Sequence, residues 1–165
     1  MKRGIILGLF VLLAFCTHGQ AGGRGLVGGV PARVLRAAPC SSRHAVSGGV
    51  RLELTGIYID SALLWFVFRG VNRSAIDFRA GGMRFLVRDR HAMKRRALQE
   101  LRLMPLVRRE APVIRADSAV QLCYGLTPRV PGRAQELVIE WVEKNGDRRM
   151  QLRVPASALL RARRL

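Results

Sequence analysis

The sequence predicts an all-β protein: a single immunoglobulin-like β-sandwich of about seven or eight strands with a short C-terminal helix. Two observations support this fold class. From Arg51 onward, short runs of β-branched, aromatic and aliphatic residues recur between turn residues, at the spacing typical of a sandwich. In addition, Pro105, Pro112, Pro128 and Pro131 fall between these runs, where the missing backbone donor of proline breaks no strand pairing.

The first twenty residues have the pattern of a secretory signal peptide. Lys2 and Arg3 precede the unbroken apolar run of residues 5–16, and polar and small residues follow it. This run is shorter than the roughly 20 residues that a membrane-spanning helix needs. We therefore expect cleavage near Gln20 and Ala21 and an exported, periplasmic or outer-membrane-associated protein.

A second processing route remains open. Residues 13–16 could form a degenerate lipobox, in which Cys16 would be lipidated and would attach the protein peripherally to a membrane. Lipoprotein processing favours a small residue before the cysteine, whereas Phe15 is large. Soluble export is therefore the favoured interpretation.

The expected domain organisation has four parts. Residues 1–20 form the signal peptide, and residues 21–49 form a flexible arm, because seven glycines interrupt its short apolar pieces. Residues 51–154 form the sandwich. Residues 155–165 form a short basic helix or tail, in which arginines in the last helical turn would complement the helix dipole.

Residues 51–69 are expected to form the first hairpin, turning near Asp60 and Ser61. Its second strand is apolar on both faces over residues 63–68, as in a central strand that is covered on both sides. The remaining strands before the last hairpin are expected at residues 76–79 and 83–88, separated by Gly81-Gly82, and at residues 97–103 and 120–124.

A second hairpin, near the C-terminal end, gives the clearest signal. Both residues of Asn145-Gly146 tolerate the positive φ of a type I′ turn. The register set by this turn pairs Glu143 with Arg148, Trp141 with Met150, Ile139 with Leu152 and Leu137 with Val154. These pairs share an apolar face, apart from the charge pair at the tip, so that face should contact the core.

The opposite face of this hairpin has no core to fill. Its polar side chains include Glu140, Arg149 and Arg153, which we therefore take as candidate interface residues. Glu140 and Glu143 differ in strand parity and should point to opposite faces, so they cannot act together as an acid–base pair.

Two cysteines remain if Cys16 is removed with the signal peptide. In an exported protein, Cys40 and Cys123 could form a disulfide. The favoured alternative is that Cys123 is a small buried hydrophobe in an apolar strand, because Cys40 lies in the expected arm. Together with His44 and His91 these cysteines show no zinc-site spacing, so no metal or cofactor is expected.

The sequence carries no recognised catalytic motif. A nucleophile elbow, a His-Glu-x-x-His pair, a phosphate loop and a dinucleotide fingerprint are all missing from it. We therefore expect a protein that is not an enzyme.

The formal net charge of +18 favours partners that are anionic. However, the 26 arginines and 3 lysines are scattered along the chain, and aromatic residues for stacking on bases are few. Direct nucleic-acid binding is therefore disfavoured.

Five motifs occur in order along the predicted sandwich. They are residues 52–58 (LELTGIY), Asn72-Arg73-Ser74 with Asp77, residues 83–89 (MRFLVRD), Lys94-Arg95 with Gln99-Glu100, and residues 140–146 (EWVEKNG). Together they resemble the C-terminal domain of the TraN proteins of Bacteroidetes conjugative transposons, over roughly residues 51–154. Members of that family carry a further N-terminal β-domain, whereas only the arm precedes the sandwich in this sequence.

The resemblance implies a periplasmic or outer-membrane-associated structural subunit of a conjugative type IV secretion apparatus. Its expected partners are other conjugation-channel proteins, namely a small lipoprotein and an inner-membrane-spanning component, and homo-oligomers could also form. The alternative is an exported basic binding module that docks polyanions such as glycans, lipopolysaccharide or nucleic acid.

Overall fold

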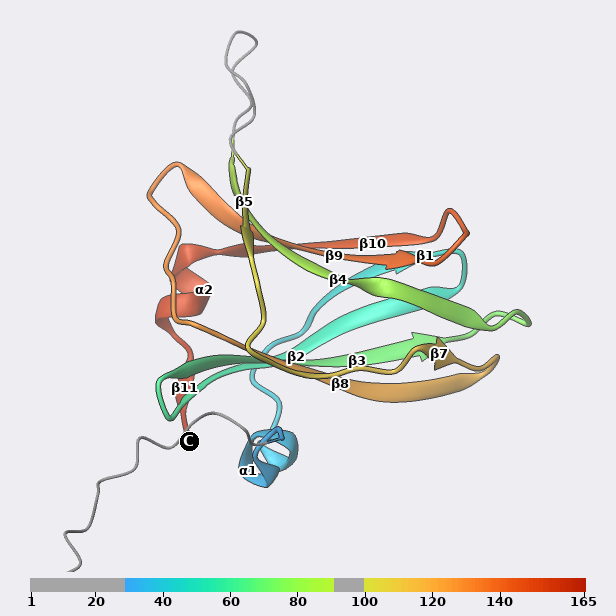
Figure 1. Cartoon of the computed structure of the whole chain (residues 1–165), viewed down its shortest axis with the longest axis horizontal. Coiled ribbons are helices and arrows are strands. Elements are labelled where there is room, and N and C mark those ends of the chain that lie inside the picture. Colours follow the sequence, from blue (N-terminus) through green and yellow to red (C-terminus); the bar gives the residue numbers. More distant parts are fainter. Residues whose placement is uncertain (1–28, 91–99) are drawn as a thin grey trace, which may run out of the picture.

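The structure is a computed structural model that describes residues 29–90 and 100–165. Two antiparallel sheets pack face to face in it (Figure 1), which confirms the all-β sandwich and its short C-terminal helix. The expected signal peptide, its cleavage point at Gln20 and Ala21, and Cys16 lie outside the described residues. Within the described ranges, no helix is long and apolar enough to span a bilayer.

The larger sheet has six strands. In order they are β1 (Arg43–Ser47), β2 (Val50–Asp60), β3 (Leu63–Asn72), β8 (Ser118–Leu126) and β6 (Val107–Arg109), with β11 (Arg163–Arg164) beside β2. The first hairpin is confirmed as β2–β3, and its turn residues Ser61 and Ala62 have φ values of 49° and 66°. The turn lies one residue later than expected.

The smaller sheet has five strands. In order they are β10 (Arg149–Pro155), β9 (Gln135–Glu143), β4 (Phe78–Asp89) and β5 (Glu100–Leu103), with β7 (Val113–Ile114) beside β4. The β9–β10 hairpin has the predicted register, since Trp141 pairs with Met150 and Ile139 pairs with Leu152. Asn145 has a φ of 60° at the turn, but the φ of Gly146 is not positive. The predicted type I′ turn is therefore wrong, because that turn needs a positive φ at both residues.

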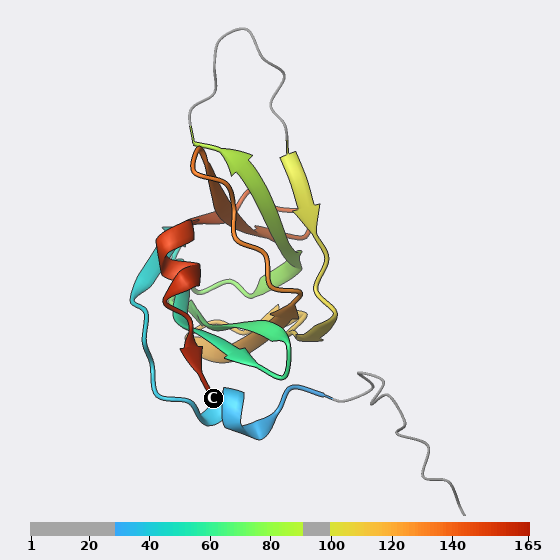
Figure 2. The same ribbon diagram turned by 90° about the vertical axis from the view of Figure 1, so that its left-hand side faces the viewer.

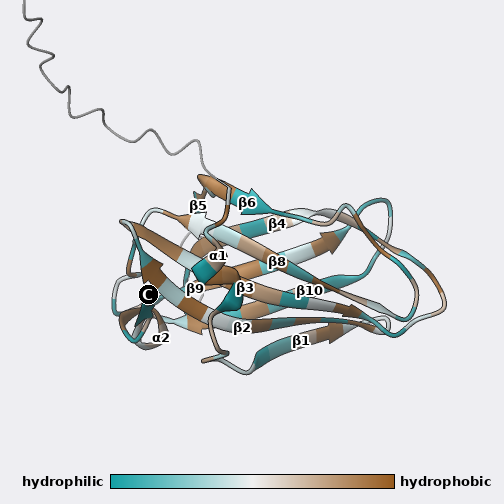
Figure 3. Ribbon diagram, turned by 90° about the horizontal axis from the view of Figure 1, so that it is seen from below, coloured by the Kyte–Doolittle hydropathy of each residue, from teal (hydrophilic) through white to brown (hydrophobic). Residues whose placement is uncertain are grey.

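The core lies between the two sheets. Phe66 and Phe68 from β3 meet Phe85 from β4, with ring centroids 5.5 and 6.4 Å apart, and Tyr124 from β8 joins them. Apolar and polar residues alternate along strands such as β10, as the hydropathy colouring indicates (Figure 3). One face of each such strand therefore fills the core.

The prediction that Gly81-Gly82 separates two strands is wrong. β4 runs continuously across the pair, and its register against β9 shifts between Ala80 and Gly82. Gly82 has a φ of 111°, which L side chains rarely adopt. The glycines therefore form a bulge, which inserts one extra residue and still returns Met83 to the core side.

The prediction of a flexible arm is also wrong for its described part. Residues 32–36 form helix α1 (Ala32–Arg36), and the chain then runs along one side of the molecule into β1 (Figure 2). We refer to residues 30–38 as the strap. Val34 of the strap is fully buried against the outer face of the larger sheet, in a cluster with Tyr58, Trp65 and Val67. Central strand β3 is thus covered on both sides, as predicted.

The tail departs from the prediction as well. Helix α2 (Ala156–Leu160) ends before the arginines, and Arg163 and Arg164 form β11, which pairs in parallel with Tyr58 and Ile59 of β2. β1 covers the edge of β2 only as far as Leu54, so the tail supplies hydrogen-bond partners farther along this edge. Edge pairing, rather than the helix dipole, thus determines where these two arginines lie.

Candidate interaction surfaces

The structure places Glu140, Arg149 and Arg153 on one face, the outer face of the smaller sheet, as strand parity predicts. Their environments differ. Arg149 is exposed, and Arg153 is 67% exposed with Glu136 as an ion-pair partner at 3.4 Å. Glu140, in contrast, is only 5% exposed, so it cannot serve as a freely accessible contact residue.

Glu140 is buried in a polar network. Its carboxylate accepts hydrogen bonds from Arg88 at 2.9 Å and from Gln151 at 3.2 Å. Arg88 also binds Glu100 on β5 at 2.6 Å, so one guanidinium joins β4, β5 and β9. Strand parity predicts the correct face for Glu140. It cannot show that neighbouring side chains donate hydrogen bonds to this carboxylate and cover it.

A second cluster holds the sheets together at the β9–β10 turn. Arg148 forms an ion pair with Glu143. It also donates hydrogen bonds to the Asp77 carbonyl at 2.8 Å and to the Ser74 hydroxyl at 3.2 Å. Its guanidinium lies 5.3 Å from the centre of the Phe78 ring. The hydrogen bond from Arg148 lowers the pKa of Glu143, and the same bond to Glu143 raises the pKa of Arg148.

Asn72 completes this cluster from the end of β3. It is fully buried, donates to the carbonyls of Ile76 and Ile114, and accepts from the amide and hydroxyl of Ser74. We call Asn72, Ser74, Asp77, Glu143 and Arg148 the turn clamp. Asn72-Arg73-Ser74 also matches a glycosylation acceptor pattern, but in the folded protein the Asn72 amide is buried and hydrogen-bonded.

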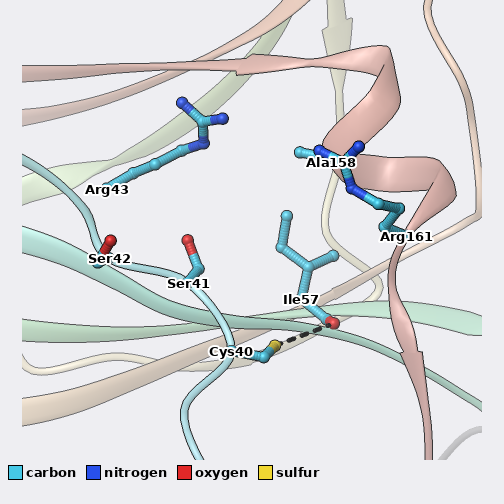
Figure 4. A pocket seen from close by; sticks show the side chains of 7 residues that line it. All are labelled: Cys40, Ser41, Ser42, Arg43, Ile57, Ala158 and Arg161. Carbon is cyan, nitrogen blue, oxygen red and sulfur yellow. Dashed lines mark hydrogen bonds between the residues drawn. The ribbon is translucent and has the colours of Figure 1, made fainter.

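An open groove of about 400 Å³ lies where the chain leads into β1, between β2 and α2. Figure 4 shows Arg43 on one side of it and Arg161 on the α2 side, with Ile57 between them. Neither arginine has an ion-pair partner among the described residues. The groove can therefore accept an acidic group. No sequence pattern predicts this groove, because Arg43 and Arg161 are far apart in the chain and meet only in the fold.

The two cysteines do not form a disulfide in this structure. Cys40 is exposed, and its backbone amide donates to the Thr55 carbonyl at the edge of β2, so two strands separate it from Cys123 on β8. At about 4.8 Å per strand, that separation far exceeds the reach of a disulfide. Cys123 is buried, and burial raises the pKa of its thiol to about 12, as expected for a small core residue.

Possible metal ligands do not gather in the part of the chain that the structure describes. No group of three or more histidine, cysteine, aspartate or glutamate side chains is suitably placed within residues 29–90 and 100–165. His44 is exposed on β1, and His91 lies outside the described residues.

The described residues form one arginine-rich β-sandwich that is held together by buried polar networks. The chain belongs to the DUF4138 family, a domain of unknown function whose family model matches residues 33–164. No curated protein matches the chain. The match begins in α1 and ends in β11, so the family domain includes most of the strap and the tail, both predicted to lie outside the sandwich.

Proposed function

We propose that this protein is a non-enzymatic structural subunit of a conjugative type IV secretion apparatus, in the periplasm or at the outer membrane. It acts by assembling with other channel proteins. The ordered motifs that resemble the TraN family support this role, and the β-sandwich fold agrees with what the resemblance implies.

The observation that carries the proposal is how the polar residues of those motifs are used. Asn72, Ser74 and Asp77 come from one motif and Glu143 from another, and the turn clamp joins them. Hydrogen bonds of the clamp occupy the side-chain polar atoms of Asn72, Ser74 and Glu143. Asp77 joins the clamp through its backbone carbonyl, and its carboxylate accepts from the Ala116 amide. Motif residues that maintain the fold favour a protein that works through its faces and strand edges.

The test is an affinity pull-down of the tagged full-length protein from detergent-solubilised envelopes of its native host, followed by mass spectrometry. We expect the small lipoprotein and the inner-membrane-spanning component of a conjugation channel to co-purify and to survive a high-salt wash, because a mainly apolar contact is little weakened by salt. Recovery of the protein alone would contradict the proposal.

A second candidate is an exported binding module for polyanions such as glycans, lipopolysaccharide or nucleic acid. The groove between Arg43 and Arg161 and the net charge of +18 favour it. Binding of this kind should weaken steeply as salt rises. Titration with heparin at low and high salt, using Arg43→Glu against the exposed control Arg115→Glu, tests whether the groove is responsible.

A further inference from the structure

One edge of β4 is only partly paired. The fully paired edge of β4 lies against β9, from Ala80 to Asp89. On the partly paired edge, β7 pairs with Phe78 and Arg79, and β5 pairs only with residues 85–88. Between them, residues 81–84 have no strand neighbour on this side among the described residues. Unpaired edge backbone of this kind can pair with another strand.

A cleft of about 360 Å³ lies beside this unpaired segment. Its wall includes Gly81, Gly82 and Met83, and its floor is formed by Leu122, Tyr124 and Trp141 from the core. The connection between β5 and β7 crosses from one sheet to the other and closes its far side. The volume is within the lower range of known ligand sites, about 300 Å³ and above.

The rim of the cleft is mainly cationic. Arg102 and Arg108 line it, and Glu110, which lies 3.9 Å from Arg108, is the acidic residue on this rim. Arg84 adds an exposed guanidinium within the unpaired segment. Three arginines against one glutamate favour an acidic partner segment.

Exposed apolar side chains continue from this rim. Leu101, Met104 and Leu106 on β5 and the connection that follows it are 43%, 64% and 57% exposed. Such a cluster beside an unpaired strand edge and a cleft is typical of a protein contact site.

We propose that residues 81–84 of β4 and the adjacent cleft bind an extended segment of a partner protein. The segment adds to β4 as a short strand, one apolar side chain enters the cleft above Tyr124, and flanking acidic residues meet the three rim arginines, Arg84, Arg102 and Arg108. Backbone pairing supplies affinity, and the cleft selects the side chain. This inference rests on the proposed function, since it names the contact through which the subunit assembles.

The bulge explains why this edge remains open. Gly82, at a φ of 111°, bends the strand between the stretches paired to β7 and β5. A bulge increases the local twist, so one flat strand cannot pair along the whole edge. A short partner segment, in contrast, needs to match only four residues.

The first experiment uses the isotopically labelled full chain and a panel of ten-residue peptides. Each peptide alternates valine and threonine around a central Phe, Leu, Ile or Trp, with aspartates at both ends. We expect NMR shift changes at the amides of Gly81 and Gly82 and at the Trp141 indole. Replacing the central apolar residue with serine should weaken binding by at least about tenfold. Shift changes confined to other strand edges, or none with any peptide, would overturn the proposal.

A matched pair of variants tests the rim. Arg108 and Arg109 are neighbours on β6, both exposed, but Arg108 pairs with Tyr124 on the core-side face and Arg109 with Cys123 on the opposite face. Arg108→Glu should weaken peptide binding several-fold, and Arg109→Glu should leave it unchanged. Equal effects of the two variants would show that binding responds only to net charge.

The same variants separate this inference from the proposed function. If channel proteins co-purify with the wild type and with Arg108→Glu alike, and no peptide binds, the subunit assembles through another surface and the inference fails. If the peptides bind at residues 81–84 but no channel protein co-purifies, the site stands and the proposed function fails.

Discussion

Individual side chains hold this sandwich together at two opposite ends. At one end, Arg148 of the β9–β10 turn donates to Ser74 of the β3–β4 loop, and Asn72 donates to the Ile114 carbonyl of β7. At the other end, Arg33 of the strap binds both oxygens of Asp60, at 2.6 and 2.5 Å, and Asp60 is nearly buried. Each contact is between residues distant in sequence, so each limits how the sheets and the strap can move.

Asn72→Ala should be strongly destabilising. The change removes a fully buried side-chain amide that donates to the carbonyls of Ile76 and Ile114. We expect a loss of about 3 kcal/mol of unfolding free energy, measured by urea denaturation. The exposed neighbour Arg73→Ala is the control and should change stability by less than about 0.5 kcal/mol. Equal losses would contradict the assignment of Asn72 to the turn clamp.

The Arg33–Asp60 pair predicts a specific pH dependence. The Arg33 guanidinium lowers the pKa of Asp60 in the folded protein, so this contribution to stability is present above the unfolded value of about 3.9. It is lost as pH falls through the lower folded pKa. At pH 7, the urea concentration at the unfolding midpoint should therefore be higher for the wild type than for Asp60→Asn. This difference should shrink below about pH 4. A difference that stays constant down to pH 2 would contradict this account.

At the scale of elements, glycine and apolar positions determine how the strands and the strap are arranged. The β9–β10 hairpin follows from its turn and its alternation, whereas the bulge in β4 depends on a single backbone conformation at Gly82. The strap depends on one buried residue, Val34, more than on helix propensity, because α1 has only five residues.

Gly82→Ala should destabilise the protein through the backbone alone. An added Cβ would meet no atom within 4 Å, so no clash is expected, but the φ of 111° is unfavourable for any L side chain. We expect a loss of about 1–2 kcal/mol in chemical denaturation. Gly29→Ala also meets nothing within 4 Å and lacks the positive φ, so it should be neutral. A neutral Gly82→Ala would show that the bulge can relax.

Val34→Asp should release the strap without unfolding the core. A buried charge without a partner is costly, and undocking the strap is the least expensive way to hydrate it. Trp65 lies under the strap, whereas Trp141, the other tryptophan, lies in the core between the sheets. Acrylamide should therefore quench about half of the fluorescence in the variant, with roughly one of two tryptophans accessible.

The control for this variant is Ala32→Asp, which introduces the same charge at an exposed position of the same helix. Its quenching should equal that of the wild type. Quenching of both tryptophans in Val34→Asp would mean that the strap and the core unfold together.

For the whole molecule, the sequence predicted the class of fold and much of its pairing. The β2–β3 and β9–β10 hairpins could be predicted because both turns and both apolar faces are local signals. The strap and β11 could not, because a five-residue helix and a two-residue strand acquire their structure only from the surface of β2 and β3. For the candidate interface residues, strand parity predicted the face of the sheet on which they lie. It could not predict that Glu140 is buried, because that burial depends on Arg88 from another strand.

The two cysteines allow a test of whether the whole sandwich unfolds as one unit. Cys40 is exposed and should react at once with a thiol reagent in the native protein, whereas buried Cys123, with a thiol pKa of about 12, should react only after global unfolding. Peptide mapping after timed labelling measures both rates. The stability should be the same with and without reductant. Fast labelling of Cys123 would reveal a local opening of β8.

The parallel pairing of β11 with β2 also constrains the order in which the chain can fold. Arg163 and Arg164 reach Tyr58 and Ile59 only after every other strand has been synthesised. A chain that emerges residue by residue from a ribosome or a translocation pore therefore exposes this stretch of β2 until residue 164 has passed. During that interval the edge of the larger sheet can be recognised by a chaperone, and completion of the sheet ends the opportunity.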